Sequence, residues 1–270
     1  MNSNFFYDKT ICSVMGILNV TPDSFFDGGK YKTVETAVKR AIEMVEQGAK
    51  IIDVGGESTR PGSEDISIEE ELDRVIPVIE AIRDQCDVNI SIDTKKVEVA
   101  KKAIEAGAGM VNDVTGLINP NMVKLVSECG VYVVIMHMQG TPVDMQNKPQ
   151  YDNVVNEIKN WLNERVKNAI NNGIKKDKIL IDPGIGFGKT LEHNLEILKR
   201  MNEFIGIAEG IVVGASRKSF IEHLTGAKPE ERLGGSLSAA VVSALSGVNI
   251  VRVHDVKESK QAIDLVNSIR

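Results

Sequence analysis

Residues 110–138, MVNDVTGLINPNMVKLVSECGVYVVIMHM, contain one complete strand, helix and strand in succession. Two short runs rich in β-branched residues, 110–115 and 132–138, enclose a longer segment whose apolar residues recur at intervals of three and four. Gly130 stands where this helix should end, a position at which glycine most easily holds a left-handed backbone. The apolar run YVVIM is typical of a parallel strand buried on both faces. This stretch therefore predicts one βαβ unit of a parallel sheet.

The same alternation runs through the whole chain. Eight strands are predicted, at 11–20, 50–55, 89–94, 110–115, 132–138, 178–183, 211–216 and 250–255. Gly48, Gly107 and Gly173 mark further helix ends, as Gly130 does. A (β/α)₈ barrel needs roughly 250 residues, so we expect the chain to be of class α/β, with residues 1–270 forming a single TIM-barrel domain. An open, doubly wound sheet is the alternative.

Composition limits the possible partners. The chain has 270 residues, 42% of them hydrophobic, and a net charge of -6. This charge disfavours the extended basic surface that binds nucleic acid or an anionic membrane. The sequence shows neither a signal peptide nor a run of about 20 apolar residues, so we expect a cytoplasmic protein with neither kind of partner. The three cysteines are widely spaced, and no catalytic role is assigned to them.

Long segments without helical periodicity follow three of the predicted strands, at 21–32, 57–67 and 140–150. In a barrel, such segments lie at the C-terminal ends of the strands, where active sites are built and where long loops often bind ligands. We therefore expect the functional site at this end.

Polar residues end the otherwise apolar strands: Asn19, Asp53, Asp93, Asn112, His137, Asp182, Ser216, Arg252 and His254. Burying an unpaired polar group costs several kcal/mol, so these side chains need partners. They could pair with one another or cap the following helices, as Asp93 and Thr94 could before residues 95–100. Taken together, they are more typical of a ligand-binding site.

The acidic and amide members of this set predict the kind of ligand. Asp93, Asn112 and Asp182 offer acceptors suited to a flat ring with several adjacent N–H groups, such as an aminopyrimidine.

Basic side chains gather at the last two strand ends, where barrels commonly bind phosphate: Arg217, Lys218, Arg252 and His254. The segment DPGIGFGKT at 182–190 is similar to a phosphate-binding P-loop, but Pro183 occupies the required glycine position. No nucleophile and base pair and no zinc motif are found, so catalysis should depend on positioning and on stabilising a leaving group. Pyrophosphate held with Mg²⁺ is such a leaving group, and Asn19 could supply a hard oxygen ligand to the metal.

Seven segments, taken in order, closely resemble the dihydropteroate synthase family: MGILNVTPDSFFDGG, GGESTRPG, SIDTKK, VNDVTG, DPGIGFGK, GASRKSF and VRVHDV. The resemblance extends from about Val14 to Val256. It implies a transferase of folate biosynthesis, which condenses 6-hydroxymethyl-7,8-dihydropterin diphosphate with p-aminobenzoate and releases pyrophosphate. It also implies a dissociative mechanism, competition by sulfonamides and a homodimer formed through outer helices.

The resemblance also implies a role for individual residues. Those expected to hold the pterin are Asp93, Asn112, Asp182, Phe187 and Lys218. Those expected to hold the diphosphate with Mg²⁺ are Asn19, Thr59, Arg252 and His254. Those expected to close over p-aminobenzoate or contact its carboxylate are Phe25, Arg60, Pro61 and Ser219, and Lys218 would border this site. Asp93, Lys218 and Arg252 are the expected catalytic residues. Phe26 departs from the family pattern, in which serine is commoner, and leaves open which of Phe25 and Phe26 contacts substrate.

Two alternatives share the pterin pocket. A pterin-dependent methyltransferase would keep Asp93, Asn112 and Asp182 but would not need the basic set or the loop that carries Arg60. A pterin-binding protein that has lost catalysis could keep every one of these residues.

Overall fold

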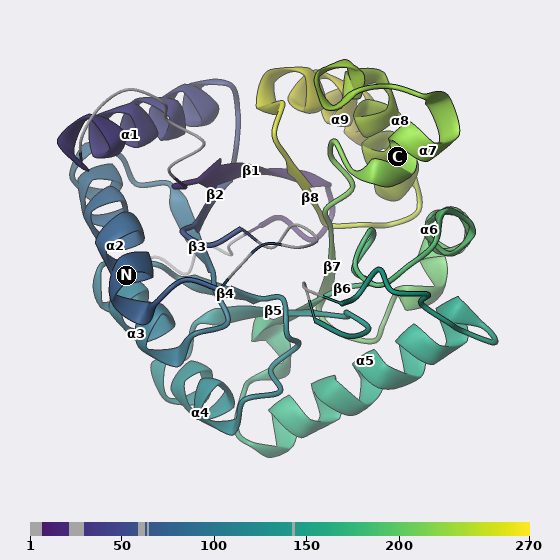
Figure 1. The fold of residues 1–270 in the computed structure, drawn as a ribbon, viewed down its shortest axis with the longest axis horizontal. Coiled ribbons are helices and arrows are strands. Elements are labelled where there is room, and N and C mark those ends of the chain that lie inside the picture. Colours follow the sequence, from purple (N-terminus) through teal and green to yellow (C-terminus); the bar gives the residue numbers. More distant parts are fainter. Residues whose placement is uncertain (1–6, 22–29, 59–62, 64, 142–143) are drawn as a thin grey trace.

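A computed structural model describes residues 7–21, 30–58, 63, 65–141 and 144–270. Eight parallel strands close into a barrel in sequence order, and helices surround it (Figure 1). The strands are β1 (Ser13–Asn19), β2 (Ile51–Gly55), β3 (Asn89–Asp93), β4 (Met110–Asp113), β5 (Tyr132–Met136), β6 (Ile179–Asp182), β7 (Gly210–Val213) and β8 (Ile250–Val253).

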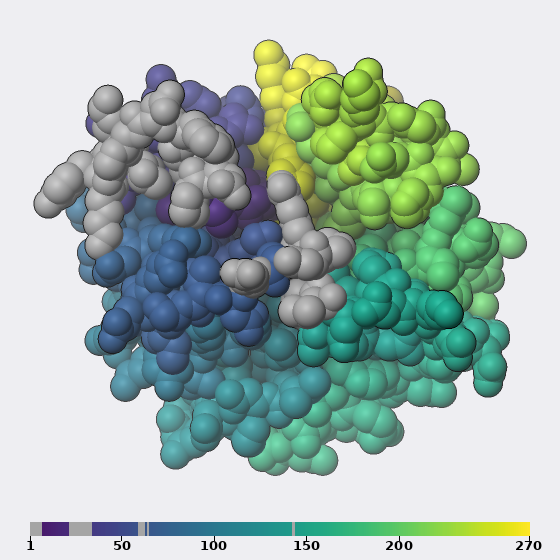
Figure 2. Space-filling model, in the orientation of Figure 1, coloured from purple at the N-terminus to yellow at the C-terminus, as the bar shows by residue number. Residues whose placement is uncertain are grey.

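The helices of the described residues follow the strands. They are α1 (Lys30–Glu46), α2 (Ile68–Gln85), α3 (Val97–Glu105), α4 (Pro120–Cys129), α5 (Val154–Asn171), α6 (Leu191–Lys199), α7 (Ser219–Thr225), α8 (Leu233–Leu245) and α9 (Val256–Ile269). Short 3₁₀ turns lie at Lys176–Lys178, Met201–Phe204 and Pro229–Glu231. In the space-filling view, the segments surround the barrel in chain order, from blue through teal and green to yellow (Figure 2).

The barrel is closed by pairing of the first and last strands. Ser13 of β1 pairs with Ile250 of β8, and Met15 pairs with Arg252. The eight predicted strands are confirmed, and the open-sheet alternative is excluded. Three predicted strand ends lie beyond the observed strands, because His137, Ser216 and His254 belong to the loops that follow β5, β7 and β8.

Local sequence explains where several helices begin and end. The Ser67 hydroxyl accepts a hydrogen bond from the Glu70 amide at the start of α2, which satisfies one of the free N–H groups of the first turn. Gly130 ends α4 with a φ of 64°, in the left-handed region that glycine adopts without a Cβ clash. The predicted left-handed glycines Gly48, Gly107 and Gly173 are also confirmed.

Two layers of apolar packing surround the strands. One large cluster lies between the strands and the helices, and a smaller one is formed by strand residues and Tyr7. The smaller cluster comprises Tyr7, Met15, Ile51, Met110, Tyr132, Val134, Leu180, Val212 and Ile250. Within the described residues, no helix is both long and apolar enough to cross a membrane.

Side-chain alternation shows which residues follow the smaller cluster toward the C-terminal ends of the strands. Successive strand residues point to opposite faces, so a residue two positions further along points inward again. Two positions beyond Ile51, Met110, Leu180, Val212 and Ile250 stand Asp53, Asn112, Asp182, Gly214 and Arg252. On β2, β4, β6 and β8 the barrel interior therefore changes from apolar to polar within two residues, at the C-terminal end of the strand.

Candidate active site

Arg252 of β8 links two acidic side chains across the top of the barrel. Its Nε donates a hydrogen bond to Asp53 Oδ2 at 2.6 Å, and its Nη2 donates to Asp93 Oδ2 at 2.6 Å. Asp53 Oδ2 also accepts a hydrogen bond from Asn112 Nδ2 at 3.1 Å. The three other side chains of this network, Asp53, Asp93 and Asn112, are buried. The expectation that strand-end side chains pair with one another is therefore partly correct, and Asp93 pairs with Arg252 instead of capping α3.

The network holds more acid than base. One guanidinium faces two buried carboxylates, and burial raises the pKa of Asp93 to about 7 although Arg252 opposes the shift. The same two carboxylates raise the pKa of Arg252, which stays protonated. Within the described residues, Asp53 Oδ1 and Asp93 Oδ1 are buried without a hydrogen-bond partner. Such atoms are costly unless a bound group pairs with them, so this end of the barrel is prepared for a ligand with hydrogen-bond donors.

Two glycines leave space where the strand ends converge. A Cβ placed on Gly55 would lie 3.5 Å from Asp93 Cβ and 3.7 Å from Asn19 Oδ1. A Cβ placed on Gly214 would lie 3.8 Å from Arg252 Cβ and 4.0 Å from Lys218 Nζ. Asn19 and Asp93 therefore lie together beside Gly55, and Lys218 and Arg252 lie together beside Gly214. The hydrogen bond from Arg252 to Asp93 joins the two pairs.

Lys218 follows β7 and reaches back over the loop after β6. Its Nζ donates to the carbonyl of Ile185 and lies 4.3 Å from the centre of the Phe187 ring. Burial lowers the pKa of Lys218 to about 8, and the nearby Asp182 carboxylate opposes that shift. Lys218 is thus a desolvated cation over an aromatic ring, an arrangement that strengthens its interaction with the ring.

Asp182 ends β6 and is also buried. Its Oδ1 accepts a hydrogen bond from the Gly184 amide at 2.7 Å. Burial raises the pKa of its carboxyl, and Lys218 is the largest opposing influence. Asp182, Phe187 and Lys218 therefore form a second part of the site, next to the network of Arg252.

The last two strand ends differ in part from the prediction. Ser216 Oγ lies 3.0 Å from His254 Nδ1 and accepts a hydrogen bond from the His254 amide at 3.2 Å. Arg217 is paired with Asp255 through two hydrogen bonds of 2.6 and 2.9 Å, so its guanidinium is already neutralised, and we correct its assignment to the phosphate donors. Ser219 is exposed at the start of α7.

The predicted metal ligand can be tested against the donors present. Asn19 ends β1, and its Oδ1 lies within van der Waals contact of the Cβ position at Gly55, which also borders Asp93 Oδ2 at 3.8 Å. A single amide oxygen beside a carboxylate suits Mg²⁺, which keeps most of its shell as water and phosphate oxygens. Among the described residues, no three His, Cys, Asp or Glu side chains are grouped as metal ligands. These donors thus fit Mg²⁺ better than they fit a metal ion that needs three or four protein side chains as ligands.

Four predicted residues lie outside the described part of the chain: Phe25, Thr59, Arg60 and Pro61. Phe26, the other candidate for the first loop, is outside it as well.

Two features were missed from sequence. Asp53 was noted only as a strand-end residue, but it is the buried partner of Arg252. Its position two residues after the inward Ile51 could have indicated this role. Lys189 lies in the β6–α6 loop and is buried beside His137, whereas its sequence context indicates only a resemblance to a P-loop.

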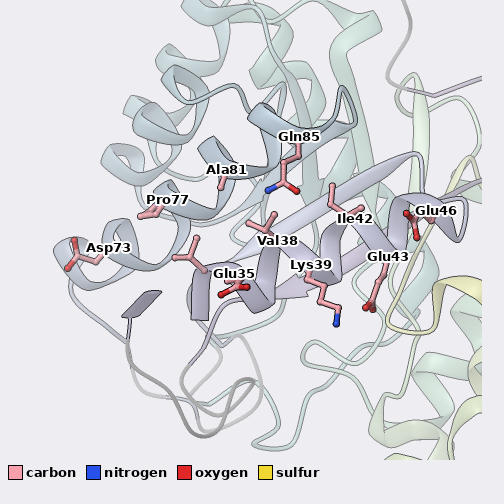
Figure 3. Close-up of a pocket in the computed structure, with 11 residues that line it drawn as sticks. Glu35, Val38, Lys39, Ile42, Glu43, Glu46, Asp73, Pro77, Ala81 and Gln85 are labelled. Carbon is pink, nitrogen blue, oxygen red and sulfur yellow. The ribbon is translucent and has the colours of Figure 1, made fainter. Parts of the chain in front are cut away.

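A groove of about 1150 Å³ lies elsewhere, on the outside of the barrel between α1 and α2 (Figure 3). Val38 and Ile42 of α1 and Pro77 and Ala81 of α2 are among its lining residues. None of its lining residues belongs to the predicted site.

We predict a specific pH dependence from Asp93. Its pKa is about 7 when folded and near 3.8 when unfolded, so between these values the folded protein holds a proton that the unfolded chain lacks. The free energy of unfolding should then fall by roughly 1.4 kcal/mol for each unit by which the pH rises. Asp93→Asn mimics the neutral form and should gain about 2 to 3 kcal/mol over wild type between pH 5 and pH 7.

Urea unfolding of both proteins across this range measures the difference. Asp84→Asn, on the exposed end of α2, is the control and should show a constant offset. A difference between Asp93→Asn and wild type that does not change with pH would contradict the prediction.

Comparisons with known proteins show the family of this chain. Residues 15–254 match the pterin binding enzyme family. Dihydropteroate synthase from Escherichia coli K12 is 49% identical over 255 residues, 94% of this chain and 90% of that protein. The Yersinia pestis dihydropteroate synthase bound to a sulfonamide drug is 43% identical, with a TM-score of 0.92 over 97% of this chain and 96% of that one.

A dihydropteroate synthase from Xanthomonas albilineans, in complex with 7,8-dihydropteroate, is 41% identical with a TM-score of 0.88, over 97% of this chain and 95% of that one. The family match and these identities both extend over nearly the whole chain. The chain therefore belongs to the pterin-binding enzymes, as a member of the dihydropteroate synthase family.

Proposed function

We propose that this protein is a transferase that condenses 6-hydroxymethyl-7,8-dihydropterin diphosphate with p-aminobenzoate, giving 7,8-dihydropteroate and pyrophosphate. The observation that carries the proposal is the cluster of buried acceptors and desolvated cations at the strand ends, formed by Asp93, Asp182, Lys218 and Arg252, in a chain of this family. We treat residues 1–270 as one functional domain.

The pterin would lie between the two acidic parts of the site. Its aminopyrimidine edge presents several donors in one plane, and Asp182, Asn112 and Asp93 are the buried acceptors available to them. The unpartnered Asp93 Oδ1 supports this placement, because a ring N–H would pair with it. Phe187 would pack against the ring, below Lys218.

The diphosphate would lie toward the ends of β1 and β8. Asn19, Thr59, Arg252 and His254 are its proposed ligands, with Mg²⁺ on Asn19. When bound, Mg²⁺ would neutralise charge on the departing pyrophosphate. Arg252 would act from the same side, since its guanidinium is held in place by Asp53 and Asp93.

The reaction would begin with loss of the leaving group. The bond between the pterin methylene carbon and the diphosphate oxygen breaks, and its electron pair leaves with pyrophosphate. Asp93, next to the ring, would stabilise the cation that remains. The amine of p-aminobenzoate then uses its lone pair to form the C–N bond, and the surplus N–H proton passes to solvent. An aniline nitrogen needs no strong base, which agrees with a site that lacks an evident one among the described residues.

The second substrate would bind above the pterin. Phe25, Arg60 and Pro61 are proposed to close over p-aminobenzoate, Lys218 to border it and Ser219 to contact its carboxylate. The exposed position of Ser219 at the first residue of α7 leaves its hydroxyl accessible from solvent. Sulfonamides would compete for this position.

The two alternatives are less well supported. A pterin-dependent methyltransferase would not need the desolvated Lys218 or the ion pairs that hold Arg252. A pterin-binding protein without catalysis is tested directly by the reaction below. A cytoplasmic location and the lack of nucleic-acid and membrane partners stay predictions from sequence.

We predict that pyrophosphate is released only when the pterin diphosphate, p-aminobenzoate and Mg²⁺ are all present, because the diphosphate ligands and the amine site are separate. A coupled pyrophosphate assay, with each component omitted in turn, measures this requirement. Absence of product from folded protein in the complete mixture would contradict the proposed function.

We also predict that Asp182→Asn weakens pterin binding much more than pyrophosphate binding. The substitution replaces a buried charged acceptor with an amide, which should cost about ten- to hundredfold in pterin affinity. Calorimetry with 6-hydroxymethylpterin and with pyrophosphate plus Mg²⁺ measures the two losses. Equal losses for both ligands would count against the pocket assignment.

We propose in addition that the protein is a homodimer. Helix α8 carries no charged residue along its 13 positions, and Val242 and Leu245 on its outer face are 44% and 54% exposed. Leu224 at the end of α7 and Leu265 on α9 are exposed large apolar residues as well, and α9 packs against α8. An exposed apolar face of this kind is typical of a subunit interface.

Val242→Glu should convert the dimer to a monomer, because it buries an unpaired charge at the interface. Light scattering after gel filtration measures the mass. Ile118→Glu, at a residue that is 65% exposed before α4, is the matched control and should stay dimeric. A monomeric wild type at micromolar concentration would exclude the proposal.

A further inference from the structure

Lys189 is a buried lysine that the proposed chemistry does not use. It lies in the loop between β6 and α6, and only 3% of its surface is exposed. A buried ammonium is costly unless its hydrogens are paired, and burial accordingly lowers the pKa of Lys189. Its Nζ has three neighbouring acceptors.

These acceptors come from two separate segments. Lys189 Nζ donates to the Phe187 carbonyl at 2.8 Å, within its own loop. It also lies 3.1 Å from His137 Nδ1 and 3.4 Å from the His137 carbonyl, just beyond β5. The His137 ring packs edge-on against Trp161 at 5.0 Å, and burial lowers its pKa to about 2. A neutral, fixed imidazole thus faces the lysine.

The loop that Lys189 fixes has an unusual backbone. Gly184, Gly186 and Gly188 all have positive φ, at 72°, 81° and 61°. A Cβ on Gly184 would lie 1.9 Å from the His137 carbonyl oxygen. The loop backbone therefore lies directly against His137, just beyond β5, and at Gly184 this approach leaves no room for a side chain.

The other side of this loop faces the site. Ile185 presents its carbonyl to Lys218, Phe187 presents its ring to the same ammonium, and Gly184 donates its amide to Asp182. The Lys189 side chain folds back within the same loop and donates a hydrogen bond to the carbonyl of Phe187. A shift of that carbonyl would move the ring and with it the support of Lys218.

We propose that Lys189 is a positioning residue for the pterin half of the site: with His137 it ties the β6–α6 loop to the end of β5, and so sets the places of Phe187 and Lys218. It does not touch substrate. The inference rests on the proposed function, because its readout is pterin recognition.

Lys189→Met tests the inference, since methionine fills the space but donates no hydrogen bond. We expect the KM for the pterin diphosphate to rise about ten- to hundredfold, because methionine no longer joins the Phe187 carbonyl to His137 by hydrogen bonds. The KM for p-aminobenzoate should rise by a smaller factor, because Lys218 only borders that site and the proposed carboxylate contact is Ser219 of α7.

Two variants accompany it. Lys199→Met, at an exposed lysine of α6, is the matched control and should leave both KM values unchanged. Lys189→Gln retains donor hydrogens on a shorter side chain and should raise the pterin KM by a smaller factor than Lys189→Met. It also tests the inference alone if Lys189→Met fails to fold.

Calorimetry with 6-hydroxymethylpterin distinguishes a failure of the proposed function from a failure of the role of Lys189. Wild type that does not bind this pterin would contradict the proposed function. Wild type that binds it, with Lys189→Met binding equally well, would overturn the role of Lys189. An equal rise in both KM values, or equal losses for Gln and Met, would also overturn it, because a general loss of stability would then explain the result.

Discussion

One guanidinium between two buried carboxylates is the constraint on which the site depends. Arg252 cannot satisfy Asp53 and Asp93 fully at the same time, so one carboxyl holds its proton up to about pH 7 and each acid has a buried oxygen without a partner among the described residues. This arrangement is costly in an empty protein. It is the kind of imbalance that a ligand with ring N–H donors and a departing anion would relieve.

The barrel makes this arrangement possible by closing. Arg252 is 199 residues from Asp53 in sequence, and the two side chains meet only because β8 pairs with β1 and β1 with β2. The closure is stabilised by apolar packing on both sides of the strands. A rigid scaffold of this kind can hold strained or unpaired polar groups at its rim without unfolding.

The second part of the site, around Asp182, Phe187 and Lys218, depends on the backbone conformation of the β6–α6 loop rather than on ion pairs. Three glycines with positive φ allow the β6–α6 loop to pack against the residue after β5. Lys189 holds the loop there through the Phe187 carbonyl and His137. Lys218 is then supported by Ile185 and Phe187 of that loop. The candidate site is thus formed by two parts, a strand-end ion network and a glycine-rich loop, which meet at Asp182 and Lys218.

The sequence alone determined the eight strands and the polar residues at their C-terminal ends, because hydrophobic periodicity, glycine at helix ends and polar residues at strand ends are local signals. It could not determine which polar groups pair. Asp53 and Arg217 illustrate this: the first is the buried partner of Arg252, and the second is neutralised by Asp255. For Lys189, the sequence indicates only a place in a segment similar to a P-loop. Pairing, burial and the resulting pKa values depend on distances between residues far apart in the chain, and only the closed tertiary structure sets those distances.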